Sequence, residues 1–120
     1  MELLRHAGGE APGYDGAFTG EVRLGMLQTA ASEERPDVAR VEFLDGAVTF
    51  WHRHPGGQSL LLLEGRGEVG TEAERHVLGP GDFVVATAEE RHWHGAIPGG
   101  SCVFLALTWG ATAWEAKPPR

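Results

Sequence analysis

The sequence predicts an all-β domain, built as an antiparallel sandwich or barrel of roughly eight to ten short strands. Short stretches along the chain alternate apolar and polar residues, as strands with one buried face do. Glycine and proline turn signals separate these stretches. No stretch keeps a helical periodicity for more than two turns. These observations together favour a compact β architecture over any helical fold.

The N-terminal part of the chain predicts an arm followed by a strand. The arm is rich in Gly, Ala and Pro, with room for one short strand over residues 2–5. Residues 21–29 then alternate Val22, Leu24 and Met26 with charged or small residues. This pattern is typical of a half-buried strand.

The next segment predicts a loop and a hairpin. Residues 30–37 are polar and end in Pro36-Asp37, which leaves space for one helical turn at most. Residues 38–44 alternate again and form the next expected strand. The pair Asp45-Gly46 is a strong hairpin signal that leads into the strand beyond it.

Residues 47–58 form the stretch around which the rest of the chain is organised. In an extended strand, Val48, Phe50, His52 and His54 share one face. Two histidines on an apolar face need polar partners, and their spacing can direct two ring nitrogens at one divalent metal ion. The alternative is that both are surface histidines of an edge strand.

Two further features favour the metal site over that alternative. Gln58 follows the turn at residues 55–57 and can bring an amide oxygen to the same point. A second cluster, His92-Trp93-His94, again places two imidazoles on one strand face.

The second half of the chain reads as short strands separated by turns. The expected elements are a buried strand over 58–63, a turn or bulge at 65–67, a hairpin over 68–78 with its tip near 71–73, a turn at 79–82, and strands over 83–86, 91–96 and 101–109.

Composition limits the classes of function. A chain of 120 residues fits one domain, and its apolar runs, such as 60–63, are too short to cross a bilayer. The net charge is −7 and Lys and Arg form no cluster, which argues against a nucleic-acid partner. The N-terminus lacks a signal-peptide pattern, and the single cysteine, Cys102, cannot form an internal disulfide. We therefore expect a cytoplasmic protein with no membrane partner.

The two histidine clusters and their glycines resemble the two motifs of the cupin superfamily. The first motif, Gly-x5-His-x-His-x3-Glu-x6-Gly, fits residues 46–65, and the second, Gly-x5-Pro-x-Gly-x2-His-x3-Asn, fits residues 81–96. The resemblance implies one cupin domain over 1–120, a double-stranded β-helix barrel of jelly-roll type. The matching positions are Gly46, His52, His54, Gln58 and Gly65, then Gly81, Thr87, Glu89, His92 and Ala96. Every spacing is kept, but Gln58 replaces the usual Glu, and Thr87, Glu89 and Ala96 replace Pro, Gly and Asn.

Within that superfamily the chain resembles small single-domain cupins that include the manganese-dependent hydroxynitrile lyases. The shared pieces are Phe18-Thr19-Gly20, Val22-Arg23, Trp51-His52, His54-Pro55, Gly57-Gln58, Pro80-Gly81-Asp82, His92-Trp93-His94-Gly95-Ala96 and Trp114. The resemblance implies a lyase that splits a cyanohydrin into a carbonyl compound and cyanide, with manganese as its metal.

The expected metal ligands are His52, His54, Gln58 and His92, which would hold one divalent ion per chain. Imidazole and oxygen ligands suit Mn, Fe, Ni, Co or Zn, and the resemblance favours Mn. The neutral amide of Gln58 leaves the full 2+ charge at the site, which favours Lewis-acid chemistry over oxidation.

His94 is the candidate general base, because an unperturbed imidazole titrates near neutral pH and the matching histidine of the resembling lyases is thought to move the hydroxyl proton. The alternative is a structural, hydrogen-bonded histidine. His6 and His76 read as surface histidines, and Cys102 reads as a buried small apolar residue rather than a nucleophile.

The expected substrate pocket consists of the apolar residues that flank the ligands, namely Val48, Phe50, Leu60 and Leu62. Such a pocket suits a small, uncharged or aromatic substrate, and the alternative is that these side chains simply fill the barrel. The four tryptophans are expected on the outer face or at a subunit contact, at positions 51, 93, 109 and 114.

The leading prediction is therefore a metal-dependent lyase of hydroxynitrile-lyase type that acts on a small molecule. The alternatives are a cupin dioxygenase or isomerase acting on a small aromatic or sugar-derived substrate, and a non-catalytic metal- or ligand-binding cupin. We also expect a homodimer through the N-terminal segment, with Val22, Leu24 and Met26 as its apolar face, because barrel edges need covering and related cupins commonly pair this way.

Overall fold

The computed structural model describes residues 1–5, 11–13, 16–30 and 32–120 of the chain. Within these residues the secondary structure consists of short β-strands. In chain order they are β1 (Ala11–Pro12), β2 (Val22–Gln28), β3 (Asp37–Phe43), β4 (His52–Arg53), β5 (Gln58–Gly65), β6 (Gly67–Gly70), β7 (Arg75–Leu78), β8 (Phe83–Ala86), β9 (Trp93–Ala96), β10 (Cys102–Thr108) and β11 (Ala113–Trp114).

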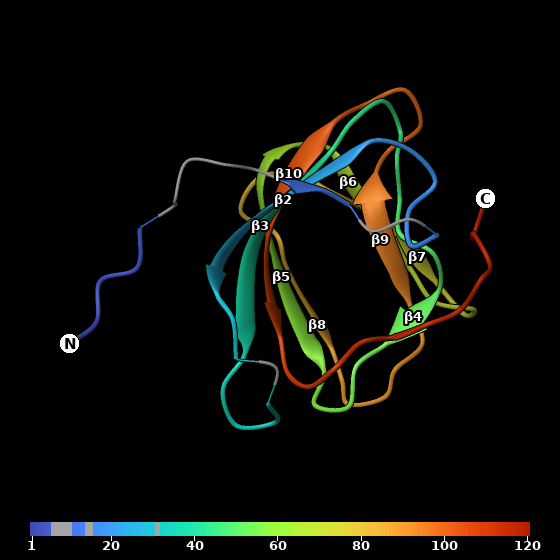
Figure 1. Ribbon diagram of the computed structural model, residues 1–120. Helices are drawn as coiled ribbons and strands as arrows, with labels where there is room; N and C mark the ends of the chain where they lie inside the picture. The colour runs from blue at the N-terminus through green and yellow to red at the C-terminus, as the bar shows by residue number, and fades with distance from the viewer. Residues whose placement is uncertain (6–10, 14–15, 31) are drawn as a thin grey trace.

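The strands form two walls of a barrel. One wall is a six-stranded antiparallel sheet in the order β1-β2-β3-β10-β5-β8. The opposite wall contains the three-stranded sheet β7-β6-β9 and the short pair β11-β4 (Figure 1). The predicted all-β barrel is confirmed, and alternation along β3, β5 and β10 directs one row of side chains from each strand into the space between the walls.

The core lies between the walls at one end of the barrel. Phe43, Leu60, Leu62 and Phe104 are fully buried there, and Phe43 meets Phe104 edge to face with ring centroids 5.9 Å apart. Burying a side chain of this size contributes about 2 kcal/mol to the free energy of unfolding. The opposite end of the barrel carries the polar side chains of the candidate site.

The sequence-based strands agree with the structure from residue 21 onward, except around 47–58. The expected strand over 2–5 does not form, and residues 32–35 form bends instead of a helical turn before β3 begins at Asp37. The sequence did not predict β1 or β11, because strands of two residues are too short to carry an alternating pattern.

The stretch 47–58 is a strand only in part, and its alternation shifts by one residue. Val48 is fully buried on the outer side with Trp51, whereas Thr49, His52 and His54 all face the inside of the barrel. The chain bends at Trp51, between two isolated bridges and β4. The strict alternation expected over 47–58 is therefore wrong between Thr49 and His52.

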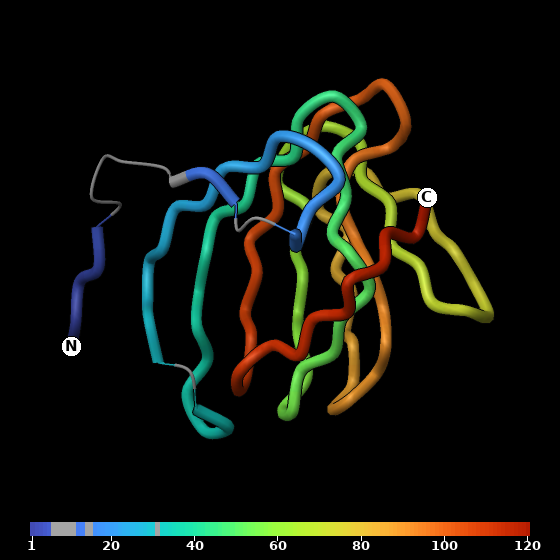
Figure 2. Tube along the Cα trace, turned by 45° about the vertical axis from the view of Figure 1, so that its right-hand side comes forward, coloured from blue at the N-terminus to red at the C-terminus, as the bar shows by residue number. Residues whose placement is uncertain are grey.

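The segment after β10 crosses the open end of the barrel and runs along the second wall (Figures 1 and 2). Its backbone pairs with the chain at Trp51, whose amide donates to the carbonyl of Lys117 at 3.0 Å. Its end is fixed by Arg120, which forms an ion pair with the buried carboxylate of Glu68 and also donates to the carbonyl oxygen of Ala96. This segment, residues 110–120, is called the C-terminal strap below.

The N-terminal end, unlike the C-terminal strap, does not pack on the barrel. Residues 1–5 point away from the barrel, and Leu3 and Leu4 expose 71% and 44% of their surface (Figure 2). Across the described residues, no helix is long and apolar enough to span a membrane.

Candidate metal centre

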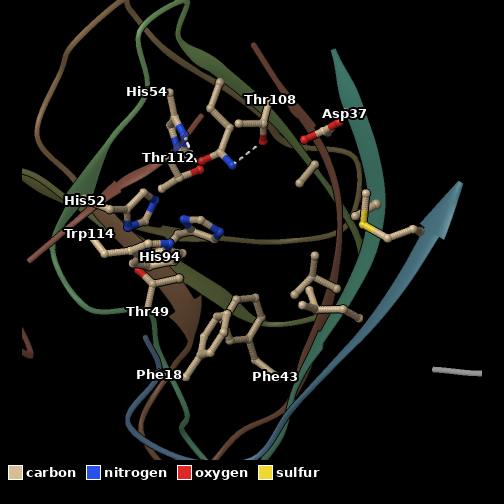
Figure 3. A pocket seen from close by; sticks show the side chains of 16 residues that line it. Phe18, Asp37, Phe43, Thr49, His52, His54, His94, Thr108, Thr112 and Trp114 are labelled. Carbon is tan, nitrogen blue, oxygen red and sulfur yellow. Dashed lines mark hydrogen bonds between the residues drawn. The ribbon is translucent and has the colours of Figure 1, made fainter. Parts of the chain in front are cut away.

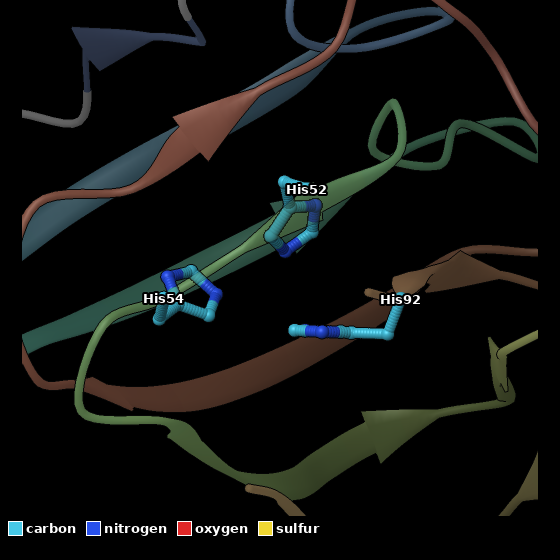
Figure 4. Close-up of side chains that lie close together, drawn as sticks. All are labelled: His52, His54 and His92. Carbon is cyan, nitrogen blue, oxygen red and sulfur yellow. The ribbon is translucent and has the colours of Figure 1, made fainter. Parts of the chain in front are cut away.

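Three histidines converge at the open end of the barrel. His52 lies on β4, His54 follows it, and His92 immediately precedes β9. His52 and His92 form an antiparallel bridge in which each backbone amide donates to the other's carbonyl, at 3.0 and 2.9 Å. One ring nitrogen from each of the three imidazoles lies within 4.8 Å of the other two (Figure 4). The two-residue spacing of His52 and His54 and the backbone bridge together bring the rings to one point.

Hydrogen bonds at the Nδ1 atoms fix two of the three rings. His52 Nδ1 donates to the carbonyl oxygen of Phe50 at 2.8 Å, and His92 Nδ1 donates to that of Glu90 at 2.9 Å. A carbonyl oxygen can only accept, so the proton of each neutral ring resides on Nδ1 and the Nε2 lone pair is free. Histidines that bind metals in proteins are commonly held in this way.

The third ring is held from the C-terminal strap. His54 Nδ1 lies 3.0 Å from the hydroxyl oxygen of Thr112. Among the described residues, the buried Nε2 atoms of His52 and His54 have no hydrogen-bond partner. Leaving two buried ring nitrogens without partners is costly, and a divalent cation would satisfy both. The residues present therefore fit a metal ion.

Gln58 supplies an oxygen at the same point. Its Oε1 lies 3.0 Å from His92 Nε2, and its Nε2 donates to the hydroxyl of Thr108 at 2.8 Å. Gly57 makes the close approach possible, because its φ is +88° and a Cβ there would lie 2.7 Å from the carbonyl oxygen of Ala86. The tight turn at 55–57 thus places Gln58 beside the histidines, as the spacing predicts.

Burial keeps these imidazoles neutral. It is the first cause that lowers the pKa of His54 to about 4 and the pKa of His92 below its usual value. The pKa of His52 is also lowered well below its usual value, first by burial and then by His92. Neutral imidazoles are the form that binds a metal ion.

A cavity opens beside the histidines and has a volume of about 150 Å³ (Figure 3). An apolar cavity of this size in a protein accepts a benzene-sized ligand. Its walls are mostly apolar and come chiefly from β2, β3, β10 and the C-terminal strap. The lining residues are Phe18, Leu24, Met26, Asp37, Ala39, Val41, Phe43, Thr49, His52, His54, Gln58, His94, Ala106, Thr108, Thr112 and Trp114.

The lining differs from the pocket expected from the sequence. Val48 packs on Trp51 and Trp93 because of the shift in alternation, and Phe50, which is half-buried, does not line the cavity. Leu60 and Leu62 share the inward face of β5 with Gln58 but lie in the core. The apolar wall is provided instead by the inward row of β3.

Leu24 and Met26 belong to this cavity wall, and Val22 belongs to the core. Met26 still exposes 43% of its surface, so only part of the apolar face that the sequence assigned to a partner subunit points inward.

His94 lies at the inner end of the cavity. Its ring packs edge to face on Phe43 and Phe104, with centroids 5.6 and 5.4 Å away, and its centroid lies 5.3 Å from that of His52. Burial first, and the neighbouring histidines second, lower the pKa of His94 well below its usual value. Its Nδ1 is buried with no partner among the described residues. His94 thus lines the cavity but stands apart from the three converging histidines.

Cys102 and His76, two other described residues that the sequence singled out, lie in the core and on the surface, respectively. Cys102 is buried in the core, and burial raises the pKa of its thiol to about 12, which agrees with an apolar packing role. His76 is exposed and pairs with Glu74 at 3.1 Å. The prediction for His6 lies outside the described residues.

Sequence reasoning missed the polar residues that surround the ligands. Thr108 could not be predicted because its contact with Gln58 depends on β10 lying beside β5, where the two residues are partners in the register. The sequence places Trp114 on the outer face or at a subunit contact, yet it lines the cavity with its ring centroid 4.6 Å from that of His52. Thr112 and Trp114 follow a turn that brings the strap back across the barrel, which local patterns do not encode.

Comparison with known proteins agrees with this architecture. A family model described as a cupin domain matches residues 39–108. The chain is 41% identical over 113 residues to (R)-mandelonitrile lyase of Granulicella tundricola, and the match covers 89% of this chain and 83% of that protein.

Solved structures give the same picture. A cupin-like protein from Thermotoga maritima matches with a TM-score of 0.81 and 30% identity, covering 98% of this chain and 90% of that one. An acetylacetone dioxygenase from Acinetobacter johnsonii matches with a TM-score of 0.72 and 16% identity, covering 95% and 76% of the two chains, a likeness of fold alone. The family match over residues 39–108 and the 41% identical relative show that this chain belongs to the cupin family.

Proposed function

We propose that this protein is a metal-dependent lyase that cleaves an aromatic cyanohydrin into an aldehyde and hydrogen cyanide. The observation that carries this proposal is the convergence of three imidazoles and one amide oxygen beside an apolar cavity that also holds His94. The relative named (R)-mandelonitrile lyase supports the reaction class and the aromatic substrate.

His52, His54, His92 and Gln58 would hold the metal ion. When bound, a divalent ion with these neutral ligands would supply Lewis acidity to the oxygen or nitrile nitrogen of the substrate. The resemblance to manganese-dependent lyases favours Mn over the other divalent ions that such ligands accept.

His94 would move the proton. Its ring lines the cavity next to the ligands, and it is neutral, so that a ring nitrogen can accept the hydroxyl proton of the cyanohydrin. As that proton leaves, the oxygen–hydrogen electron pair forms the carbonyl bond and the carbon–carbon bond to the nitrile breaks. Cyanide departs with the bonding pair and takes the proton back from the imidazolium, which restores neutral His94.

The cavity would bind the aryl group. Phe18 lies edge to face against Phe43 and Trp114, with ring centroids 6.1 and 5.7 Å away. Edge-to-face and offset contacts with such rings favour a flat aromatic group over a branched aliphatic one of equal size. The volume of the cavity suits one phenyl ring.

The test is a cleavage assay with protein loaded with Mn²⁺. We expect mandelonitrile to release benzaldehyde, detected by its ultraviolet absorbance, and acetone cyanohydrin to react more slowly. Protein stripped by a chelator should regain activity when Mn²⁺ is restored. If fully loaded protein cleaves mandelonitrile no faster than the uncatalysed reaction, the proposal is refuted.

A metal-dependent dioxygenase is the second candidate. Three neutral histidines that leave open positions at the metal also suit an iron centre that activates oxygen. Oxygen consumption by the iron-loaded protein with a small aromatic or diketone substrate would favour this function.

A further inference from the structure

The amide of Gln58 can bind a metal ion in only one of its two orientations. Its oxygen is a good ligand, whereas its NH₂ group only donates hydrogen bonds. Gln58 is 6% exposed and faces His92 Nε2, a lone-pair acceptor. An amide turned the other way would donate to that nitrogen and would form a stable hydrogen bond in the metal-free protein. Something else must therefore hold the oxygen toward the histidines.

Thr108 occupies the position from which the amide can be held. Its hydroxyl oxygen accepts the Gln58 NH₂ at 2.8 Å. The two residues are partners in the register of β10 and β5, so the contact is built into the sheet. A hydroxyl group can also donate, however, so Thr108 alone would tolerate either orientation.

Asp37 removes that ambiguity. Asp37 is the register partner of Thr108 on the side of β10 away from β5. Asp37, Thr108 and Gln58 all line the cavity, and Figure 3 shows the first two side by side. The negative charge of Asp37 attracts the hydrogen of the Thr108 hydroxyl and the positive NH₂ end of the amide dipole. One carboxylate oxygen is already held by the amide of Ala30 at 2.5 Å, which fixes the side chain in place.

We propose that Thr108, polarised by Asp37, is the positioning residue that turns the amide oxygen of Gln58 toward the metal. This inference rests on the metal centre of the proposed function and adds an orienting group to it. Residues that orient metal ligands typically contribute 10- to 100-fold to metal affinity, roughly.

The test measures Co²⁺ binding to metal-free protein by calorimetry, with the visible absorption of bound Co²⁺ as a report on its ligands. Thr108→Val should weaken binding about tenfold and alter the spectrum, because the amide turns and its oxygen is lost as a ligand. Thr108→Ser keeps the hydroxyl and should retain the wild-type affinity and spectrum. Asp37→Asn should weaken binding in the same direction and by less.

The decisive comparison uses Gln58→Glu. A carboxylate presents an oxygen in either orientation, so adding Thr108→Val to Gln58→Glu should change Co²⁺ affinity by less than about twofold. An equal loss in both backgrounds would mean that Thr108 only supports packing and would overturn the proposal. Unchanged binding in Thr108→Val alone would overturn it as well.

Thr19→Val is the matched control. The Thr19 hydroxyl accepts a hydrogen bond from the amide of Val48 at 3.0 Å, away from the metal ligands. Its Co²⁺ affinity should equal that of the wild type, and a loss like that of Thr108→Val would count against a specific role. Because binding is read without substrate, protein that binds Co²⁺ in this pattern but does not cleave cyanohydrins would overturn only the lyase function.

Discussion

The Nε2 atom of His92 lies 3.0 Å from the Oε1 atom of Gln58, and both atoms are acceptors, because the proton of the His92 ring is donated to Glu90. Two buried acceptors at this distance repel each other unless a positive charge lies beside both. A divalent cation held by both atoms would remove this repulsion. The side chains are thus arranged for a cation before one binds.

The first prediction is that His52→Ala or His54→Ala abolishes metal binding. Each removes one ligand of four and leaves the others unable to compensate for the lost bond. Elemental analysis of protein purified without a chelator should find one metal ion per chain in the wild type and almost none in either variant.

His76→Ala is the control for these variants. His76 is an exposed histidine paired with Glu74, and it lies outside the converging group. It should retain a full metal complement. Stoichiometric metal in His52→Ala and His54→Ala would show that the assigned ligands are wrong.

The second prediction is that Gln58→Glu keeps the metal but slows cyanohydrin cleavage. The carboxylate has nearly the same shape and adds a negative charge at bonding distance, which lowers the Lewis acidity of the ion. Turnover of the fully loaded variant should fall below that of the wild type. Equal turnover would mean that the neutral ligand has no chemical role.

Much of this candidate centre could be predicted from the sequence, because local spacing brings its candidate ligands together. His52 and His54 lie two residues apart, and Gln58 follows a glycine turn, so short-range geometry places them. The surrounding shell depends on which strands lie side by side. Thr108 reaches Gln58 only through the pairing of β10 with β5, and Thr112 reaches His54 only because the strap returns across the barrel.

The pocket was harder to predict for a different reason. A single shift in alternation before His52 moved Val48 to the outer side and brought Thr49 inside. A shift of this kind moves every residue that precedes it to the opposite face of the strand. The sequence near Phe50 contains no glycine or proline that signals such a shift.

The third prediction concerns the acid stability of the metal-free protein. Burial lowers the pKa of the four site histidines in the folded state, to about 4 for His54, whereas the unfolded chain keeps values near 6.5. Between these values the unfolded chain binds more protons, so the free energy of unfolding is highest above about pH 6.5 and decreases as the pH falls toward 4.

Thermal unfolding of chelator-treated protein, followed by circular dichroism from pH 7.5 to 4, measures this decrease. A variant with His52→Gln and His54→Gln should show a shallower dependence, because two of the shifted groups are absent. A melting temperature that stays constant over this range would contradict the prediction.

The fourth prediction is a homodimer formed through the N-terminal segment. Val22 lies in the core and Leu24 lines the cavity, whereas Met26 remains exposed. Leu3 and Leu4 are exposed on a segment that leaves the barrel (Figure 1). Covering such side chains and the open edge of the sheet favours association.

Light scattering at micromolar concentration should give twice the chain mass of 12.9 kDa. Leu3→Ser with Leu4→Ser should shift the protein toward the monomer, whereas the same change at the exposed Val77 should not. A monomeric wild type would refute this prediction.

The last prediction is that His94→Ala and His94→Gln keep the metal while cyanohydrin cleavage slows by roughly 10²- to 10⁴-fold, the usual contribution of a positioned general base. His94 lines the cavity but stands apart from the converging histidines, so its removal should not empty the site. His94→Gln preserves most of the packing volume against Phe43 and Phe104, and glutamine cannot accept the proton.

Metal content and melting temperature must accompany the rate in both variants, because they separate three roles for His94. Loss of metal would identify it as a ligand, and a lower melting temperature with a proportionate loss of folded protein would identify it as structural. If both variants keep the metal, the fold and wild-type cleavage, a group other than His94 accepts the hydroxyl proton of the cyanohydrin. If the His94→Gln protein is folded and fully loaded but cleaves slowly, the substitution has removed the transfer of the hydroxyl proton.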